Sequence, residues 1–467
     1  MVCDRTWITQ FTISMFYFGS LCGHLLFGHI IDIWGRRAGF FSCLTIELLF
    51  GILIIYSSNI YMFIICQFAI GLTIASIFDI PFVSSIELVG PTKRAFITIL
   101  MCFTYACGVV IFATIAYFVR DWKILTLIVD IPFIAFYIYW WFLPESIRWL
   151  IVKKKYQRAE KIIQITAKVN KVSIPHNFLI SKLKDDEPNT DHRKADIPEQ
   201  FKRDLLPSND SSVSLTNFAF SLTDISNKPS VENGSQEIKH HDDFVGETEL
   251  KVKQLSIRDL LSHPNMRNKT FIITFAWIAN VVSYVGIQNY VSFLDNIHLN
   301  FLLASLAELP GYIFLWFTLD KIGRRFPFAA CMLVSGISVL ATNLVFSTSK
   351  LLVLVLALIG KIGITTSFAI IYLYASEIYP TELRGTGMAL TLTVSRIFTV
   401  AVPFITYTKW VLLPTIIMGA ITTLAGFLAL LLPETLNTNL PETLLEAEMI
   451  GLDYSIFKKL KYFTSLF

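Results

Sequence analysis

The chain alternates long apolar runs with short polar connections over most of its length. The runs are about 20 residues long, which is the length an α-helix needs to cross the roughly 30 Å hydrocarbon core of a bilayer. The pattern therefore predicts an all-α, polytopic membrane protein of about eleven spans. We place them near residues 11–33, 38–56, 61–86, 96–118, 123–143, 270–291, 298–319, 327–347, 351–375, 387–407 and 411–432.

One long polar segment interrupts this pattern. After a basic start, residues 185–245 are rich in Ser, Asn, Asp, Lys and Pro and have too few apolar groups to form a core, so we expect them to be disordered. We predict four parts: an N-terminal bundle of five spans at 1–151, a cytoplasmic loop at 152–269, a C-terminal bundle of six spans at 270–432 and a cytoplasmic tail at 433–467.

The composition supports a membrane protein. Of 467 residues, 54% are hydrophobic and 16% charged, and a formal net charge of +4 gives no sign of a nucleic-acid partner. Basic residues gather after the first, third, seventh and ninth spans, which the positive-inside bias places in the cytoplasm. The same rule places Met1 outside, so we expect a leading helix to be missing from this sequence.

Three short motifs occur twice, in the same order and displaced by 288 to 290 positions. Such a repeat predicts duplication of a six-helix unit whose first copy lacks its first helix. The matched residues are Asp32, Gly35, Arg36 and Arg37 with Asp320, Gly323, Arg324 and Arg325; Glu87 and Arg94 with Glu377 and Arg384; and Glu145 with Glu434.

The repeated motifs suggest a gate. Parallel repeats of this kind form two bundles that rock about a central site. Gly35 allows a tight turn after Asp32, so that Arg36 and Arg37 can reach acidic residues and helix C-termini on neighbouring spans. Ion pairs there would latch the inward gate and break in each cycle. The alternative is that these arginines only set the topology.

These motifs give the chain a resemblance to the major facilitator superfamily, and more narrowly to the organic cation/anion/carnitine transporter family. The narrower resemblance is carried by residues 2–5, 87–94, 120–122, 144–150, 300–303, 308–310, 377–384, 433–435 and 440–443. It implies a multi-pass protein, expected in the plasma membrane, that moves a small organic ion by alternating access without a cofactor.

Other features of the resemblance concern single positions and the start of the chain. Arg148 belongs with Glu145 among the motif residues that the resemblance assigns to the gate. Members of that family begin with a helix and a large extracellular domain, whereas this sequence begins where that domain would end. Ile147 replaces the usual Pro, and Gln67 stands where Arg is common.

Ionisable residues inside the spans are candidates for the solute site, because an isolated charge at mid-bilayer costs at least about 2.5–3.5 kcal/mol. Lys361 and Arg396 should both lie near mid-depth and could attract an anion. The position matching Arg396 is commonly basic in anion and carnitine transporters of the resembled family. Asp79 could hold a cationic group, which would favour a zwitterion. Alternatively, these cations pair with Glu308 or Asp79.

Aromatic residues complete the candidate solute site. Tyr284, Tyr372 and Trp277 fall on helices that line the cavity in this architecture, and aromatic faces suit amphipathic organic solutes. Packing against other helices or lipid would explain each of them equally well. His24 and His29 suggest a proton relay, but a neutral histidine bonded to a neighbouring helix is the reading we favour.

We therefore predict a transporter of small organic ions, with anions or zwitterions favoured over pure cations. A sugar-type facilitator is one alternative, although the Gln-Gln pair expected in the first helix of the second half is absent. A non-transporting remnant or scaffold is the other. No metal site is expected, and the absence of hydrolase or metalloprotease motifs argues against an enzyme.

Overall fold

The computed structural model describes most of the chain outside the long polar loop. The described residues are 6–89, 94–175, 179, 257–292, 296–380, 383–406, 412–436 and 443–450, with the single residues 408, 410, 438 and 441. The disorder expected at 185–245 and residues 451–467 of the tail therefore lie outside the described residues.

The first half contains four long helices and one interrupted span. These are α1 (Thr6–Trp34), α2 (Arg36–Ile55), α3 (Ile60–Leu88), α4 (Arg94–Phe118), and the run of α5 (Trp122–Asp130), η2 (Ile131–Ile138) and α6 (Tyr139–Phe142). Pro132 enters the 3₁₀ turn η2 at its start, where its missing N–H is tolerated. Two short helices follow, α7 (Ile147–Val152) and α8 (Tyr156–Val169).

The second half repeats this order with one more span. Its elements are α11 (Ile257–Ser262), α12 (Pro264–Ser292), α13 (Ile297–Leu306), α14 (Glu308–Ile322), α15 (Arg325–Val345), α16 (Lys350–Ile378), α17 (Arg384–Thr406), α18 (Leu413–Ala429) and α19 (Leu444–Met449). The helices α13 and α14 share one span, which breaks at Ala307 just before Pro310 in the first turn of α14.

The described residues contain ten helical segments long and apolar enough to cross a membrane. The eleventh predicted span corresponds to α18, which is apolar but has only 17 residues. The predicted all-α membrane fold is confirmed, and the predicted boundaries differ from the helix ends by several residues because helices extend past the apolar runs into polar turns.

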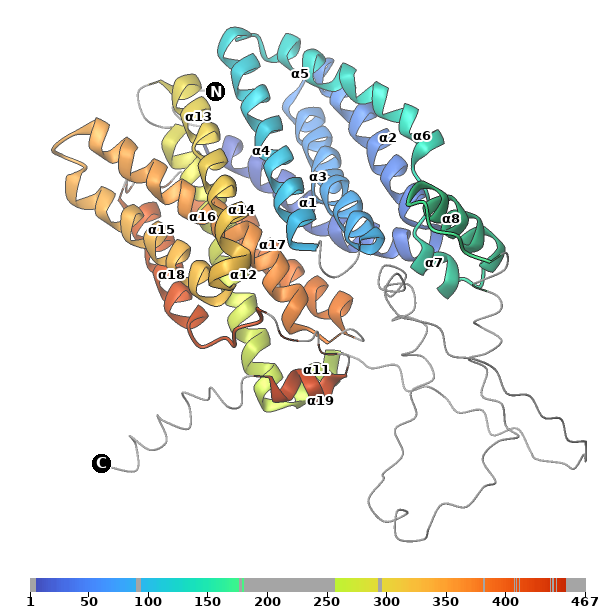
Figure 1. Ribbon diagram of the computed structural model, residues 1–467. Helices are drawn as coiled ribbons and strands as arrows, with labels where there is room; N and C mark the ends of the chain where they lie inside the picture. Colours follow the sequence, from blue (N-terminus) through green and yellow to red (C-terminus); the bar gives the residue numbers. More distant parts are fainter. Residues whose placement is uncertain are drawn as a thin grey trace, which may run out of the picture.

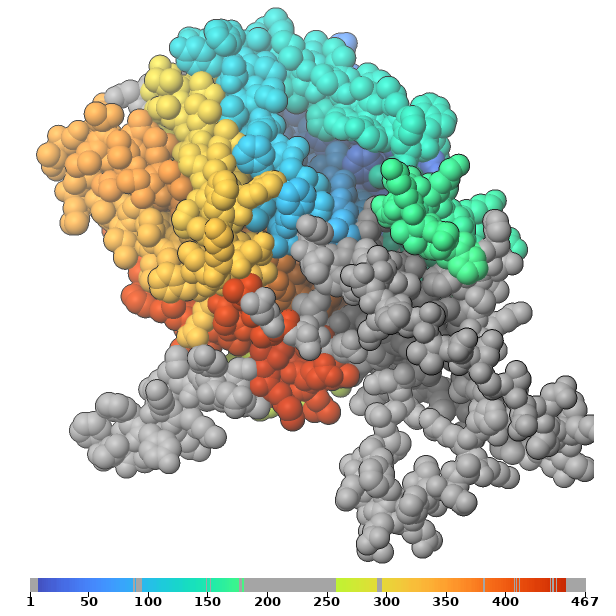
Figure 2. Space-filling view, in the orientation of Figure 1, coloured from blue at the N-terminus to red at the C-terminus, as the bar shows by residue number. Residues whose placement is uncertain are grey.

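The two halves lie side by side as separate bundles (Figure 1). They meet where α1 packs on α17 and where α4 packs on α13 and α14. The hydroxyl of Ser14 donates to the carbonyl of Val400 at 3.0 Å across the first contact. The ring centroids of Phe96 and Trp316 lie 4.9 Å apart across the second. Figure 2 shows the surfaces of α4 and α14 in contact along this seam.

The helix α12 is the centre of the second half. It packs against α13, α16, α17 and α18, and it is the most buried of the ten spans. In the sequence repeat, the helices that correspond to these four neighbours of α12 are α1, α3, α4 and the span that begins with α5. Among the described residues of the first half, no helix fills the corresponding place. The expected further helix there stays a prediction.

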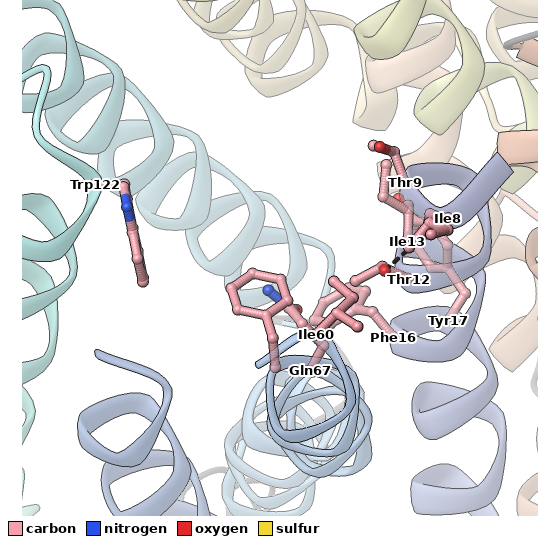
Figure 3. Close-up of a pocket in the computed structure, with 10 residues that line it drawn as sticks. Ile8, Thr9, Thr12, Ile13, Phe16, Tyr17, Ile60, Gln67 and Trp122 are labelled. Atoms are coloured by element: carbon pink, nitrogen blue, oxygen red, sulfur yellow. Dashed lines mark hydrogen bonds between the residues drawn. The ribbon is translucent and has the colours of Figure 1, made fainter. Parts of the chain in front are cut away.

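A pocket of about 770 Å³ lies between α1, α3 and α5 in the first half (Figure 3). Thr12, Phe16 and Tyr17 line it from α1, and Ile60 and Gln67 from α3. Trp122 faces it from α5. Most of the side chains that line this pocket are apolar or aromatic.

Candidate functional site

The first repeated turn is held by a carboxylate at a helix N-terminus. Glu145 accepts hydrogen bonds from the backbone N–H of Arg36 at 2.7 Å and from that of Arg37 at 3.3 and 3.4 Å. These N–H groups begin α2 and have no partner within the helix, so the carboxylate satisfies them and the helix dipole favours its charge. Gly35 makes the turn with a φ of +101°.

The second copy has the same geometry. Glu434 accepts from the backbone N–H of Arg324 at 2.8 Å and from that of Arg325 at 3.1 Å, after a turn at Gly323 with a φ of +99°. Any Cβ added at Gly35 or Gly323 would meet the capping carboxylate. Two turns 288 positions apart in sequence are therefore built by one device, and glycine is required in both.

The arginine side chains connect each turn to the end of the last membrane span in its own half. The guanidinium of Arg37 donates to the carbonyl of Trp140 in α6, and that of Arg325 donates to the carbonyl of Leu430, just past α18. The motif predicts that the arginines reach helix C-termini, and these two carbonyls lie at such ends. The carboxylates of Glu145 and Glu434 are met by the backbone N–H groups of the turns.

Ion pairs do occur in the second copy. Arg324 pairs with Glu377 of α16 at 3.3 Å and more loosely with Asp320 at 3.6 Å. Glu377 also accepts from the hydroxyl of Thr435 at 2.6 Å. These contacts join α14, α16 and the segment after α18 within the second half, and the gating role expected of them stays a prediction.

The matching positions of the first copy are described only in part. The side chain of Asp32 is exposed, and only its backbone carbonyl takes part, accepting from the indole N–H of Trp149 at 3.0 Å. In the second copy, the side chain of Arg384 at the start of α17 is half-buried. The side chains of Glu87, Arg94 and Arg148 lie outside the described residues, so their expected roles remain predictions.

Aromatic rings connect the two halves at the centre of the molecule. Tyr372 of α16 packs with ring centroids 5.1 Å from Phe82 of α3 and 4.7 Å from Trp277 of α12. Phe78 stacks on Phe82 and also contacts Tyr105 of α4. Tyr105 remains 48% exposed at this seam. Aromatic rings of α3, α4, α12 and α16 thus form one cluster between the halves.

Two opposite charges border this aromatic cluster. Asp79 of α3 interacts with the hydroxyl of Tyr372, and the positive charge of Arg396 in α17 acts on the same hydroxyl. Arg396 donates to the hydroxyl of Ser20 in α1 at 3.3 Å, while its Nε is buried and has no hydrogen-bond partner. Asp79 faces His24 of α1, with 3.4 Å between Oδ2 and Nδ1. Asp79 and Arg396, which belong to opposite halves, thus both act electrostatically on Tyr372.

Lys361 lies in a separate, closed environment. It pairs with Glu308 at 3.0 Å, and both side chains are at most 1% exposed. The ring of Tyr284 covers its ammonium group at 3.5 Å, and the Tyr284 hydroxyl donates to Glu308 at 2.9 Å. Pairing with Glu308 was one of the alternatives left open by the sequence. Lys361 and Trp277 have no exposed surface in this conformation, so direct solute contact by either stays a prediction.

Several residues of these sites were missed by sequence reasoning. Glu145 and Glu434 were assigned to the gate, but their role as backbone caps was not foreseen. Ser20, Phe78 and Tyr105 carry no signal that separates them from other residues of apolar helices. Only the repeat could have pointed to the caps, because it places a Glu at matched positions about 110 residues after each turn.

Residues 3–204 and 220–443 match the family described as "Sugar (and other) transporter". The chain is 36% identical over 457 residues to the Beta-alanine transporter of Drosophila melanogaster, covering 97% of this chain and 66% of that protein. It is 31% identical to the Carcinine transporter of the same organism, with 97% and 59% covered. It is 29% identical to the human Organic cation/carnitine transporter 2, with 95% and 70% covered. The chain thus spans about two thirds of the length of these relatives.

Solved structures show the same fold at low sequence identity. The proton:xylose symporter XylE, bound to 6-bromo-6-deoxy-D-glucose, aligns with a TM-score of 0.65 and 17% identity over 93% of this chain and 88% of that chain. The human organic anion transporter MFSD10 (TETRAN) aligns with a TM-score of 0.55 and 11% identity over 90% and 83%. These likenesses concern the fold alone.

Proposed function

Since this chain belongs to the sugar (and other) transporter family of the major facilitator superfamily, we propose that it moves a small zwitterionic amine across the plasma membrane. The resemblance to organic cation and carnitine transporters is confirmed by the relatives. The proposal that the solute has both an ammonium and a carboxylate group rests on the charges at the centre of the molecule.

The observation that carries this proposal is that Asp79 and Arg396 carry opposite charges and both act on the Tyr372 hydroxyl. Asp79 belongs to the first half and Arg396 to the second. A solute with separated positive and negative groups would satisfy the two charges at once, its ammonium at Asp79 and its carboxylate at the free Nε of Arg396. A pure cation would leave Arg396 unpaired, and a pure anion would leave Asp79 unpaired.

Two of the relatives carry names of zwitterions, while others are named for organic cations. β-Alanine and carnitine each contain a positively charged nitrogen and a carboxylate, and the proteins named for them are 36% and 29% identical to this chain. We propose that the solute contacts Asp79, Arg396 and Tyr372, and that the Lys361–Glu308 pair, Tyr284 and Trp277 form the wall behind it.

The proposed mechanism is alternating access. A solute bound between residues of both halves stabilises the state in which the halves close on it, so that differential binding drives the change of conformation. The caps of Glu145 and Glu434 keep each bundle rigid during this motion. The contact of Arg324 with Glu377 lies within the second half, and we propose that it holds the rim of this bundle together while the halves move.

A non-transporting role is the second candidate, and one observation favours it. Among the described residues, a pocket lies between α1, α3 and α5, at the place that corresponds to α12 in the second half. Measured flux decides between the two. The chain, purified and reconstituted in liposomes, should take up labelled β-alanine or carnitine saturably, and faster than tetraethylammonium, p-aminohippurate or glucose.

Variants of the charged residues test the site itself. Loss of a charge-assisted hydrogen bond costs about 1.5–3 kcal/mol, so Arg396→Gln and Asp79→Asn should each lower zwitterion uptake roughly 10- to 100-fold. Arg158→Gln, an exposed arginine on α8, should leave uptake unchanged. Equal uptake by Arg396→Gln and the unmodified chain would remove Arg396 from the site, and absence of any saturable flux would favour the non-transporting role.

A further inference from the structure

His24 and Asp79 face each other inside the first half without forming a complete hydrogen bond. Their Nδ1 and Oδ2 atoms are 3.4 Å apart, and the two side chains are 15% and 17% exposed. The Oδ2 atom of Asp79 is buried and accepts no hydrogen bond. This carboxylate therefore has room for a stronger donor than the histidine it now faces.

The groups around this pair come from every helix packed against α1. Asp79 lies on α3, and Arg396 on α17 is held to α1 through Ser20. Tyr372 of α16 reaches Asp79 from the other half. The carboxyl group that α2 carries within the membrane, Glu47, accepts from Thr73 instead. Asp79 thus faces His24, and the cation of Arg396 is held one helical turn from His24 through its contact with Ser20.

We infer that His24 is a proton carrier whose imidazolium competes with the ammonium group of the solute for Asp79, so that the chain exchanges solute for a proton. This inference rests on the proposed function, because it requires that an ammonium group bind at Asp79. It names the ion that drives transport and assigns His24 a role that packing between α1 and α3 does not require.

The charges balance in each direction of the cycle. When the solute enters, its ammonium pairs with Asp79, and the imidazolium is left beside this ammonium and Arg396 without a counter-charge. Like charges at short range in a membrane protein repel strongly, so His24 releases its proton to water on that side. After the solute leaves on the other side, His24 takes up a proton there and pairs with Asp79. One positive charge therefore occupies Asp79 in each half-cycle.

Coupling can be measured in liposomes that contain the purified chain, with the membrane potential clamped and labelled β-alanine as the probe. Uptake into vesicles that are about 1.5 pH units more acidic inside is compared with uptake at symmetric pH. One-for-one exchange converts this gradient into accumulation of up to roughly 30-fold. Equal accumulation with and without the gradient would overturn the inference while leaving the proposed function in place. Absence of saturable flux at symmetric pH would count against the proposed function instead.

A direct readout of protons supplies the second measurement. External β-alanine should raise the internal pH of vesicles that contain pyranine, because protons leave as the solute enters. In the His24→Gln variant both the pH signal and the ratio of gradient-driven to symmetric uptake should be lost, the ratio falling to about 1. His29→Gln, an exposed histidine on the same helix, should retain both. A full gradient response in His24→Gln would assign coupling to another group and overturn the inference. If His24→Gln does not fold, the pyranine signal of the unmodified chain still decides whether protons move with the solute.

Discussion

Replacing Glu434 by Ala should destabilise the second half more than any change at an exposed carboxylate of the same turn. The carboxylate accepts from four backbone N–H groups, those of Arg324 at 2.8 Å, Arg325 at 3.1 Å, Thr435 at 2.9 Å and Leu436 at 3.0 Å. Two of them begin α15, and the other two order the segment after α18. Alanine would leave these donors to water or without a partner.

The magnitude follows from the two sets of bonds. Loss of an N-terminal cap costs about 0.5–2 kcal/mol, and loss of the bonds to the segment after α18 adds a similar amount, because hydrogen bonds to charged groups are the stronger kind. A total of about 1–4 kcal/mol should lower the melting temperature by roughly 2–16 °C for a unit of this size. Unfolding in detergent, followed by fluorescence-detected size-exclusion chromatography after heating, measures this shift.

The control is Asp320→Asn in the same turn. Asp320 is exposed and contacts Arg324 only at 3.6 Å, so its removal should cost at most about 1 kcal/mol. Glu434→Gln keeps one acceptor oxygen and should fall between the two. If Glu434→Ala melts together with Asp320→Asn, the carboxylate is not a structural cap and the reasoning from the bond lengths is wrong.

Three further changes probe other buried contacts. Lys361→Met should cost about 3–5 kcal/mol of stability, because it leaves Glu308 buried and unpaired. Adding Glu308→Leu should restore much of this stability, and a double variant no more stable than the single one would contradict the reasoning. Gly323→Ala should cost about 1–3 kcal/mol, since alanine is strained at a φ of +99°, and a Tm unchanged by the substitution would refute it. Glu448 of α19 accepts hydrogen bonds from two backbone N–H groups in the first turn of α12, at 2.8 and 2.6 Å. Glu448→Gln should therefore increase hydrogen exchange in α19 and in this turn. Unaltered exchange would show that other contacts hold α19.

The length and order of the spans follow from the sequence, because each span is a local property. A helix in lipid satisfies its backbone groups within itself, so an apolar run of about 20 residues is sufficient to indicate it. The repeat of Gly35 and Gly323 was also visible, since each glycine belongs to a short motif. The interruptions at η2 and at Ala307 were not foreseen, although Pro132 and Pro310 stand beside them.

The site depended on how the helices pack against one another. In a membrane helix the faces toward lipid and toward protein are both apolar, so the sequence pattern does not fix the rotation of each helix. Contacts such as Arg396 with Ser20, 376 positions apart, or Lys361 with Glu308 arise only when the bundles are assembled. The sequence thus determined which charges lie within the membrane, and tertiary packing decided that Lys361 is enclosed with Glu308 while Asp79 and Arg396 share the seam between the halves.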